Sequence, residues 1–353
     1  MSTFLELDHV TKTFGNDGMF GKGQITVAVD DVSLSIDEDE ASITTVAGES
    51  GSGKTTLSRL LLGSHVPTDG RMLYRGKDFT KLTNRERRNF RREIQPIFQD
   101  PFEAYNPFYK VDHVLDAPIK NFKLASSDRE KKRMIEDALE MVGLLPGETL
   151  GRFPHQLSGG QRQRIMVARA LLLKPRVILA DEPVSMVDAS LRATILDSIR
   201  RLNRDLGISV VYVTHDLTTA YQISDNLMIM YRGAVVEAGT VDEVIPNPQH
   251  PYTQLLIESI PQPDPKNRWG SEPPQQNWDT SDTEIAGCRF ADRCSAVMDN
   301  CRTTVPEQYL INEHQMTRCF LHEEKGVMEN PDITSTFQTE SETIKAVPAD
   351  MSI

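Results

Sequence analysis

The feature that most constrains this fold is a glycine-rich loop placed between an apolar segment and a helical pattern. Residues 42–47 are rich in β-forming side chains and predict a buried strand, and residues 54–62 place leucines on one side of a helix. The loop Gly48–Thr55 fits the pattern G-x-x-x-x-G-K-[ST]. Its glycines let the backbone come close to phosphate oxygens, and the N-terminus of the following helix attracts anions. The sequence therefore predicts a phosphate-binding loop.

The polar side chains of this loop have separate expected roles. Lys54 can reach the β- and γ-phosphates of a nucleotide as a point charge, and Thr55 offers a hydroxyl to Mg²⁺. The residues expected to surround the phosphates are Gly48, Ser50, Gly51, Ser52, Gly53, Lys54, Thr55 and Thr56. A glycine-rich turn without a ligand is the structural alternative, and the strand and helix on either side argue against it.

A second glycine segment, Leu157–Gln161, has the sequence Leu-Ser-Gly-Gly-Gln and precedes a helical pattern over residues 161–173. Its N–H groups are expected at another helix N-terminus, which also attracts anions. One nucleotide needs only one such site. Two sites of different design in one chain indicate that each bound nucleotide is shared between two subunits.

Two adjacent carboxylates end an apolar segment that predicts a further strand. Asp181 and Glu182 follow residues 177–180, and ligands of doubly wound sheets gather at the carboxyl ends of strands. Because side chains alternate along a strand, the two carboxylates cannot do the same work. We expect Asp181 to hold Mg²⁺ through water, and Glu182 to orient or deprotonate the attacking water. A solvated strand end is the alternative.

Two further polar side chains follow predicted strands. His215 comes after the apolar residues 208–213, and Gln99 comes after residues 96–98 and before a turn-forming Asp-Pro pair. A lone histidine is more often structural than catalytic. At this position, however, a neutral imidazole could hydrogen-bond the γ-phosphate or water, and the Gln99 amide could reach Mg²⁺ or water.

In order and spacing, these segments resemble the ATP-binding subunits of ABC transporters over roughly residues 4–325. The resemblance implies an α/β fold of the P-loop NTPase type. Such a fold has a RecA-like parallel sheet, an amino-terminal antiparallel β-subdomain and a helical subdomain, here over about residues 96–175. The resemblance also implies an ATPase domain over residues 1–250. In this domain Glu182 would be the general base, and Gln99 and His215 would position the γ-phosphate and the attacking water.

The same resemblance places the second glycine segment against the γ-phosphate of the opposite subunit, in a head-to-tail dimer with two ATP molecules at its interface. The residues that would contact the partner's nucleotide are Ser158, Gly159, Gly160 and Gln161. Asp188 would carry a contact across the dimer. Phe14 aligns with the aromatic residue that stacks under adenine in this family, and a position in the core is the alternative.

Charge and hydropathy limit the partners. The net charge of −12 argues against nucleic acid or anionic lipid as the main partner. The longest apolar runs are too short to cross a bilayer, and no amino-terminal segment has the pattern of a secretion signal. We therefore expect a peripheral protein on the cytoplasmic face of the cell membrane. The resemblance implies that two integral membrane permease subunits hold it there, with a second ATP-binding subunit of the same or a different chain and, indirectly, an extracytoplasmic substrate-binding protein.

The carboxy-terminal part of the sequence has a different character. The segment His250–Leu256 is followed by a proline-rich stretch over residues 261–287 that is typical of an extended linker. All four cysteines of the chain come next: Cys288, Cys294, Cys301 and Cys319. Four cysteines close together in a cytosolic chain indicate a metal site before disulfides, although the paired C-x-x-C arms common in zinc fingers are absent.

The His-Pro-Tyr element and the cysteine spacing resemble the carboxy-terminal region of oligopeptide and dipeptide importer ATPases, in which related proteins hold a 4Fe-4S cluster. The resemblance implies such a region over residues 251–325, with the four cysteines as cluster ligands. Structural Zn²⁺ and unligated thiols are the alternatives. Residues 326–353 belong to an acidic, serine- and threonine-rich tail that we expect to be disordered.

Together these patterns predict an ATP-hydrolysing subunit of an ABC importer that powers uptake of oligopeptides or dipeptides. An oligosaccharide importer is an alternative, because no residue of an ATPase subunit contacts the cargo. A soluble ABC ATPase acting on DNA or ribosomes is disfavoured by the single cassette and the lack of sustained heptads. A non-catalytic member of a heterodimer is disfavoured by the intact Glu182 and His215.

Overall fold

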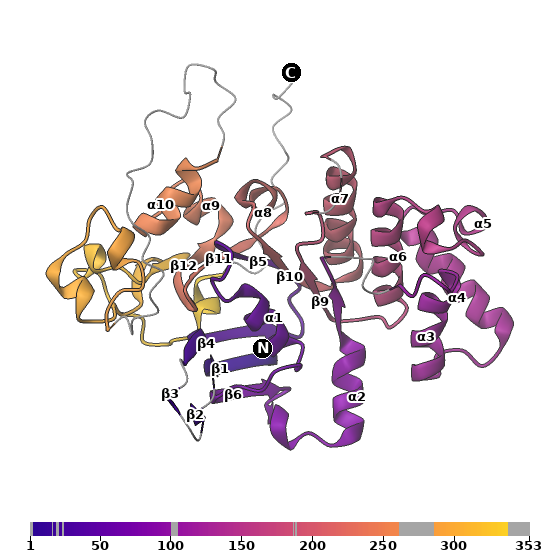
Figure 1. Cartoon of the computed structure of the whole chain (residues 1–353), viewed down its shortest axis with the longest axis horizontal. Helices are drawn as coiled ribbons and strands as arrows, with labels where there is room; N and C mark the ends of the chain where they lie inside the picture. The colour runs from indigo at the N-terminus through magenta and orange to yellow at the C-terminus, as the bar shows by residue number, and fades with distance from the viewer. Residues whose placement is uncertain are drawn as a thin grey trace, which may run out of the picture.

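The computed structural model describes residues 3–15, 17–18, 21–22, 25–99, 105–185, 187, 189–260 and 286–337 (Figure 1). These residues form an antiparallel sheet of four strands, a mixed sheet of eight strands and a helical region at the right of the view. The two predicted subdomains, one antiparallel and one helical, are therefore both present.

The larger sheet contains five parallel strands in the order β11-β5-β10-β9-β8. They are β11 (Asn226–Tyr231), β5 (Ile43–Ala47), β10 (Ser209–Thr214), β9 (Val177–Asp181) and β8 (Ile94–Ile97). The central strands are almost continuously apolar and buried because helices and the second sheet cover both faces. The phosphate-binding loop follows β5, and the acidic pair ends β9, so the parallel register brings both to one edge of the sheet.

Three antiparallel strands extend this sheet beyond β11, in the order β13-β14-β12 from the edge inward. They are β13 (Tyr309–Asn312), β14 (Gln315–Thr317) and β12 (Ala234–Thr240). The description of residues 251–325 as a small extension outside the ATPase domain is therefore not confirmed. Residues 309–312 and 315–317 are strands of the core sheet, and their backbone groups extend its hydrogen bonding.

The second sheet has the order β4-β1-β6-β7 and is antiparallel throughout. Its strands are β4 (Thr26–Asp37), β1 (Thr3–Phe14), β6 (Asp69–Tyr74) and β7 (Lys77–Asp78). A short ribbon pairs β2 (Asp17–Gly18) with β3 (Gly21–Lys22). Helix α1 (Lys54–Leu61) buries Leu57, Leu60 and Leu61 in a core shared with both main sheets, which fixes the start of α1 against the loop.

The helical region contains α3 (Asp112–Phe122), α4 (Asp128–Met141), α5 (Pro146–Thr149) and α6 (Gly159–Leu171). Helix α6 packs on α3, α4 and β8, so the region is attached at the β8 edge of the core sheet (Figure 1). Helix α2 (Asn84–Glu93) leads into β8 and begins with a capping box between Thr83 and Glu86.

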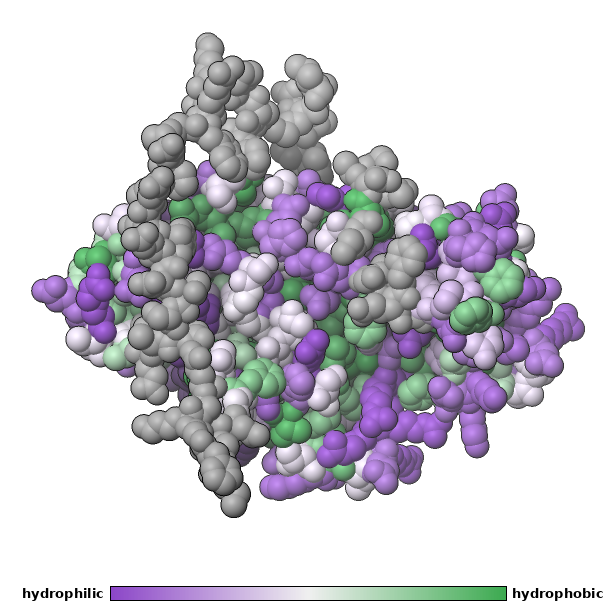
Figure 2. Space-filling view, in the orientation of Figure 1, coloured by the Kyte–Doolittle hydropathy of each residue, from purple (hydrophilic) through white to green (hydrophobic). Residues whose placement is uncertain are grey.

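The remaining helices are α7 (Ala189–Leu206), α8 (Leu217–Ile223), α9 (Val241–Val244) and α10 (Pro251–Glu258). The 3₁₀ helices are η1 (Phe79–Lys81), η3 (Pro154–Gln156), η4 (Ala291–Arg293), η5 (Asp299–Arg302), η6 (Phe320–His322) and η7 (Ile333–Thr336). Within the described helices, none combines the length and apolarity that crossing a membrane requires. Figure 2 shows hydrophilic side chains over much of the helical region at the right of the view.

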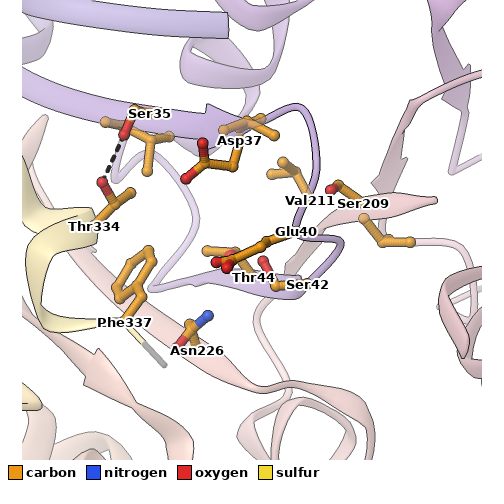
Figure 3. Close-up of a pocket in the computed structure, with 13 residues that line it drawn as sticks. Ser35, Asp37, Glu40, Ser42, Thr44, Ser209, Val211, Asn226, Thr334 and Phe337 are labelled. Atoms are coloured by element: carbon orange, nitrogen blue, oxygen red, sulfur yellow. Dashed lines mark hydrogen bonds between the residues drawn. The ribbon is translucent and has the colours of Figure 1, made fainter. Parts of the chain in front are cut away.

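The prediction of disorder from residue 326 onward is wrong for residues 326–337. Ile333 of η7 is 1% exposed and packs in the core with β4, and Ser35 and Thr334 share a hydrogen bond of 2.7 Å between their hydroxyls. Thr334 and Phe337 line a pocket of about 80 Å³ with residues of β4, β5 and β10 (Figure 3). Ile333, together with the partly buried Met328 and Phe337, buries apolar surface that holds this segment on the sheet. Residues 338–353 and the proline-rich stretch 261–285 lie outside the described residues.

Candidate active site

The phosphate-binding loop, residues 48–55, adopts backbone angles that favour glycine. Gly48 has φ 149°, and a Cβ there would lie 2.2 Å from the carbonyl oxygen of Met230 on β11. Gly53 has φ 106°, and a Cβ there would lie 2.2 Å from the carbonyl oxygen of Ala28 on β4. Both positions therefore require glycine for the loop to pass between the two sheets.

Helix α1 begins at Lys54 with its first N–H groups aimed into the loop. No side chain caps this end, and no acidic residue lies in the first turn, which contains Thr55 and Thr56. The unpaired N–H groups and the positive end of the helix dipole therefore favour an anion there. Ser52, which is buried, donates its backbone N–H to the carbonyl of Glu49 at 3.1 Å and keeps the loop curved around this end.

The Lys54 side chain lies inside the loop. Its Nζ donates to the carbonyl oxygens of Gly48 at 2.7 Å and Glu49 at 2.8 Å. Burial lowers the pKa of Lys54, although the nearby carboxylates, including Asp181 and Glu182, act in the opposite direction. The ammonium therefore lies where a bound phosphate would compete with these two carbonyl oxygens for its N–H groups.

Asp181, the last residue of β9, is half-buried beside Lys54. Burial and the neighbouring Glu182 charge raise the pKa of Asp181, while Lys54 and Arg59 lower it. A carboxylate whose charge is disfavoured by burial and by a like charge gains from a nearby cation. The Asp181 carboxylate, the Thr55 hydroxyl and the Gln99 amide offer oxygen ligands of the kind that Mg²⁺ prefers.

Glu182 is the centre of the site, because two predicted residues bind its two carboxylate oxygens. Gln99 donates from Nε2 to Oε2 at 2.9 Å, and His215 lies with Nδ1 3.0 Å from Oε1. The Glu182 backbone is left-handed, with φ 44°, and its N–H donates to Val213 of β10 at 2.9 Å. The structure thus brings together Glu182, Gln99 and His215, which follow the ends of three different strands. A pocket of about 110 Å³ beside them is lined by Glu182, Val184, Ser185, Arg192, Thr214, His215 and Asp216.

The second glycine segment, residues 157–161, forms the start of α6. Ser158 caps the helix by accepting from the Gln161 N–H at 3.2 Å, and the Gln161 side chain accepts from the Ser158 N–H at 2.9 Å. Gly159 has open space where a Cβ would be, whereas Gly160 is buried. Within the described part of the chain, no hydrogen bond or ion pair joins this segment to residues 48–56. The two glycine segments are therefore separate surfaces of one subunit.

Phe14 ends β1 and is 41% exposed, so the alternative that it belongs to the core is wrong. Its ring meets the edge of His65 at a centroid distance of 5.5 Å, and Lys12 Nζ lies 5.3 Å from the ring centroid. The exposed ring is available to stack on a planar ligand. Asp188 lies outside the described residues.

The four cysteines lie in one part of the fold, and two of them, Cys301 and Cys319, are buried. Cys288 donates its backbone N–H to the Cys301 carbonyl at 2.8 Å. Burial raises the pKa of Cys319 to about 12, and the charges of the other three thiols act in the same direction. In residues 286–337, as in the rest of the described chain, no group of three or more His, Cys, Asp or Glu side chains is arranged to hold a metal ion. The prediction of a metal site at the four cysteines is therefore not confirmed.

Sequence reasoning did not identify the contacts that the C-terminal region, defined here as residues 250–260 and 286–337, makes with the loop. Tyr252 Oη accepts from the Glu49 N–H at 2.8 Å, and Arg293 forms an ion pair with the Glu49 carboxylate at 2.7 Å. No spacing in the sequence connects these positions. The acidic Glu49 inside the phosphate-binding pattern is the one feature of the sequence that could have indicated a basic partner elsewhere in the chain.

Comparisons with known proteins agree with this geometry. A family model described as ABC transporter matches residues 29–185, and one described as oligopeptide/dipeptide transporter, C-terminal region, matches residues 236–301. A probable peptide ABC transporter ATP-binding protein of Sinorhizobium fredii is 38% identical over 304 residues, which is 86% of this chain and 85% of the relative. The oligopeptide transport ATP-binding protein OppF of Escherichia coli is 39% identical over 287 residues, which is 79% and 83%.

One solved structure is similar over most of its own length. It is the dimeric post-hydrolysis state of the ATP-binding cassette MJ0796 bound to ADP and Pi. The match has a TM-score of 0.58 at 30% identity, and it covers 67% of this chain and 98% of that chain.

Proposed function

Because the chain belongs to the ATP-binding subunits of ABC transporters, in their oligopeptide/dipeptide branch, we propose that it is the ATPase that powers import of dipeptides or oligopeptides across the cytoplasmic membrane. Relatives named for peptide, dipeptide and oligopeptide transport at 38–39% identity support the peptide cargo over an oligosaccharide. The match to residues 236–301 points the same way, because it lies in the region that carries the His-Pro-Tyr element and three of the cysteines.

The observation that carries the hydrolysis mechanism is the pair of hydrogen bonds to Glu182. With Gln99 on one oxygen and His215 on the other, the carboxylate has a fixed orientation at the end of the sheet where the loop binds phosphate. Glu182 would take the proton of the attacking water as the new bond to the γ-phosphorus forms and the bond to the β–γ bridging oxygen breaks. Gln99 and His215 would hold the water and the γ-phosphate in line.

The other residues would bind the substrate. Lys54 would exchange its loop carbonyls for the β- and γ-phosphate oxygens, and the uncapped α1 N-terminus would receive the remaining negative charge. Mg²⁺, when bound, neutralises phosphate charge; Thr55 and Asp181 would hold it, with Asp181 acting through water. The exposed Phe14 ring would stack under adenine.

We further propose that a second ATP-binding subunit completes each site. The segment 157–161 and the phosphate-binding loop do not meet within one chain, which supports a site shared between two chains. The similar cassette MJ0796 is described as a dimer with ADP and Pi bound. Ser158, Gly159, Gly160 and Gln161 would then contact the partner's γ-phosphate, with Asp188 in the same interface. The partner would be identical or related, and two membrane permeases would hold the pair at the cytoplasmic face.

Glu182→Gln tests the base assignment. The variant keeps the shape of the side chain but cannot accept a proton, so it should bind ATP with wild-type affinity and lose nearly all hydrolysis, and closed dimers should accumulate in size-exclusion chromatography with MgATP. Glu258→Gln, which changes an exposed carboxylate of α10, is the matched control and should hydrolyse normally. Substantial turnover by the Glu182 variant would show that another group is the base.

The cargo needs a separate experiment, because the ATPase can be correct while the cargo is not. Cells that produce Glu182→Gln in place of the wild-type subunit should lose uptake of labelled dipeptides or oligopeptides and keep uptake of labelled oligosaccharides. The opposite pattern would support the oligosaccharide alternative without affecting the hydrolysis mechanism.

For the cysteines we propose a 4Fe-4S cluster held by Cys288, Cys294, Cys301 and Cys319. Support comes from the donor set of four thiols in one part of the fold and from their electrostatic influence on Cys319. A 4Fe-4S cluster takes four cysteine thiolates as ligands, which is the number of cysteines in this chain. Protein purified without oxygen should contain about four iron and four sulfide per chain. Colourless protein with one zinc per chain would support the zinc alternative.

A further inference from the structure

Glu49 is an acidic side chain in the phosphate-binding loop, a place that must receive a polyanion. It follows Gly48 directly, and its carbonyl oxygen accepts from Lys54 Nζ at 2.8 Å. An uncompensated carboxylate at this position would repel the phosphates and compete with them for Lys54. The loop therefore needs a positive group that neutralises Glu49 without entering the nucleotide site.

Arg293, at the end of η4, provides that group. Its Nη1 donates to Glu49 Oε2 at 2.7 Å and its Nη2 donates to Oε1 at 2.9 Å, which is the two-pronged geometry that a guanidinium forms with a carboxylate. Only 16% of the Arg293 side chain is exposed. The guanidinium lies 5.6 Å from the ring centroids of both Tyr231 and Phe290, so aromatic contacts fix its direction.

The backbone of Glu49 is held by the same region. Its N–H donates to Tyr252 Oη at 2.8 Å, and the Tyr252 side chain is 0% exposed. The Tyr252 ring packs against Tyr231 at 4.5 Å and against Phe290 at 5.4 Å between centroids. The aromatic group that positions Arg293 therefore also positions the acceptor for the loop backbone.

A second contact attaches η4 to the other side of the loop. Arg289, two residues before η4, forms an ion pair with Asp30 of β4. The Asp30 N–H donates to the Gly233 carbonyl at 2.9 Å, and the Gly233 N–H donates to the Ser52 carbonyl at 2.8 Å. The C-terminal region thus contacts the loop at Glu49 directly and at Ser52 through two backbone hydrogen bonds.

We propose that Arg293 is a positioning residue for ATP binding: it neutralises and orients Glu49, so that the C-terminal region holds the phosphate-binding loop in the shape that receives the triphosphate. The proposal rests on the ATPase activity and is independent of the cargo and of any group bound by the cysteines. Through Arg293, residues 286–293 affect the affinity of the loop for ATP.

The test is a charge-deletion cycle in the full chain assembled with its partner subunits. Arg293→Met leaves Glu49 unpaired beside the phosphates, so KM for MgATP should rise about tenfold while kcat changes less than about threefold. Glu49→Gln alone removes the carboxylate that repels the phosphates, so KM should not rise above the wild-type value. The double variant Glu49→Gln/Arg293→Met should return KM to within about twofold of the wild type, because the pair again carries no net charge. Equilibrium binding of a fluorescent ATP analogue, measured without turnover, should follow the same order.

Arg302→Met is the matched control. Arg302 also adjoins a cysteine of this region, but it pairs with Asp292 at 3.3 Å and is 58% exposed, so its loss should leave KM unchanged. Arg293→Lys, which keeps the charge but not the two-pronged geometry, should raise KM about threefold and covers the case in which Arg293→Met does not fold. A wild-type KM in both Arg293 variants, or a KM in the double variant as high as in Arg293→Met, would overturn the proposal.

Discussion

The phosphate-binding loop and the C-terminal region obtain their geometry in different ways, although they meet at one residue. In the loop, every residue expected to contact phosphate lies between Gly48 and Thr56, and the chain itself fixes their order. The C-terminal contact joins Glu49 to Arg293 across 244 positions of sequence. It exists because the rings of Tyr252 in α10, Tyr231 in β11 and Phe290, directly before η4, pack together. The comparison teaches that a local motif can depend on a distant part of the fold that shows no motif of its own.

If the loop depends on the sheets around it, the largest effect should come from Gly48→Ala. The added Cβ would lie 2.2 Å from the Met230 carbonyl in a left-handed region of φ. We expect a loss of about 3 kcal/mol in the free energy of unfolding and no measurable ATP binding. Urea denaturation and nucleotide titration would measure both.

Gly147→Ala is the control for that experiment, because a Cβ at Gly147 meets nothing within 4 Å and the residue lies in α5. It should stay within about 0.5 kcal/mol of the wild type. Equal losses in both variants would mean that the Met230 carbonyl does not constrain Gly48. The loop conformation would then not depend on the sheets around it.

The C-terminal region should be more sensitive to acid than the loop. Burial lowers the pKa of His250 to about 3, and its Nε2 has no partner to receive a bond from a protonated ring. Because the folded pKa is below the unfolded value of about 6.5, this histidine stabilises the fold fully above pH 6.5 and progressively less as the pH falls toward 3. The loss should approach about 1.4 kcal/mol per pH unit below 6.

His250→Asn should remove this acid sensitivity. The Asn oxygen can still accept from the Tyr252 N–H, which His250 Nδ1 accepts at 3.0 Å in the structure. Free energies of unfolding measured between pH 7 and 5 should therefore fall less steeply than those of the wild type. His113→Asn, at an exposed histidine of α3, should keep the wild-type slope, and an unchanged slope in His250→Asn would contradict the interpretation.

The smallest expected effect tests whether Ser158 only caps a helix or also contacts a nucleotide. Ser158 and Ser127 cap α6 and α4 in the same way, each accepting from an N–H three residues later at 3.2 Å. Ser158→Ala and Ser127→Ala should each cost about 1 kcal/mol of stability. Only Ser158→Ala should also lower ATP hydrolysis, since only that segment would meet the partner's nucleotide. Equal hydrolysis in the two variants would reduce Ser158 to a helix cap.

The sequence was sufficient for the parts of the site that follow strands. Gln99, Glu182 and His215 were identified because polar residues ended apolar runs, and the parallel register of β8, β9 and β10 then brought them to one edge. The predicted α/β cassette fold is confirmed by the similar structures and by the sheet order. The sequence failed where burial decided the outcome: Ile333 folds a segment expected to be disordered. The exposure of Phe14 excludes the core alternative, and its stacking role stays a prediction.

The sequence by itself predicted the chemistry: a loop that binds phosphate, two carboxylates with different roles, and a helix N-terminus with free glycine N–H groups. Only the tertiary structure decided that β13 and β14 complete the core sheet and that Arg293 pairs with Glu49. The physical reason is distance along the chain. Strand and helix patterns depend on neighbours within a few residues, whereas an ion pair across 244 positions depends on how all the intervening elements pack.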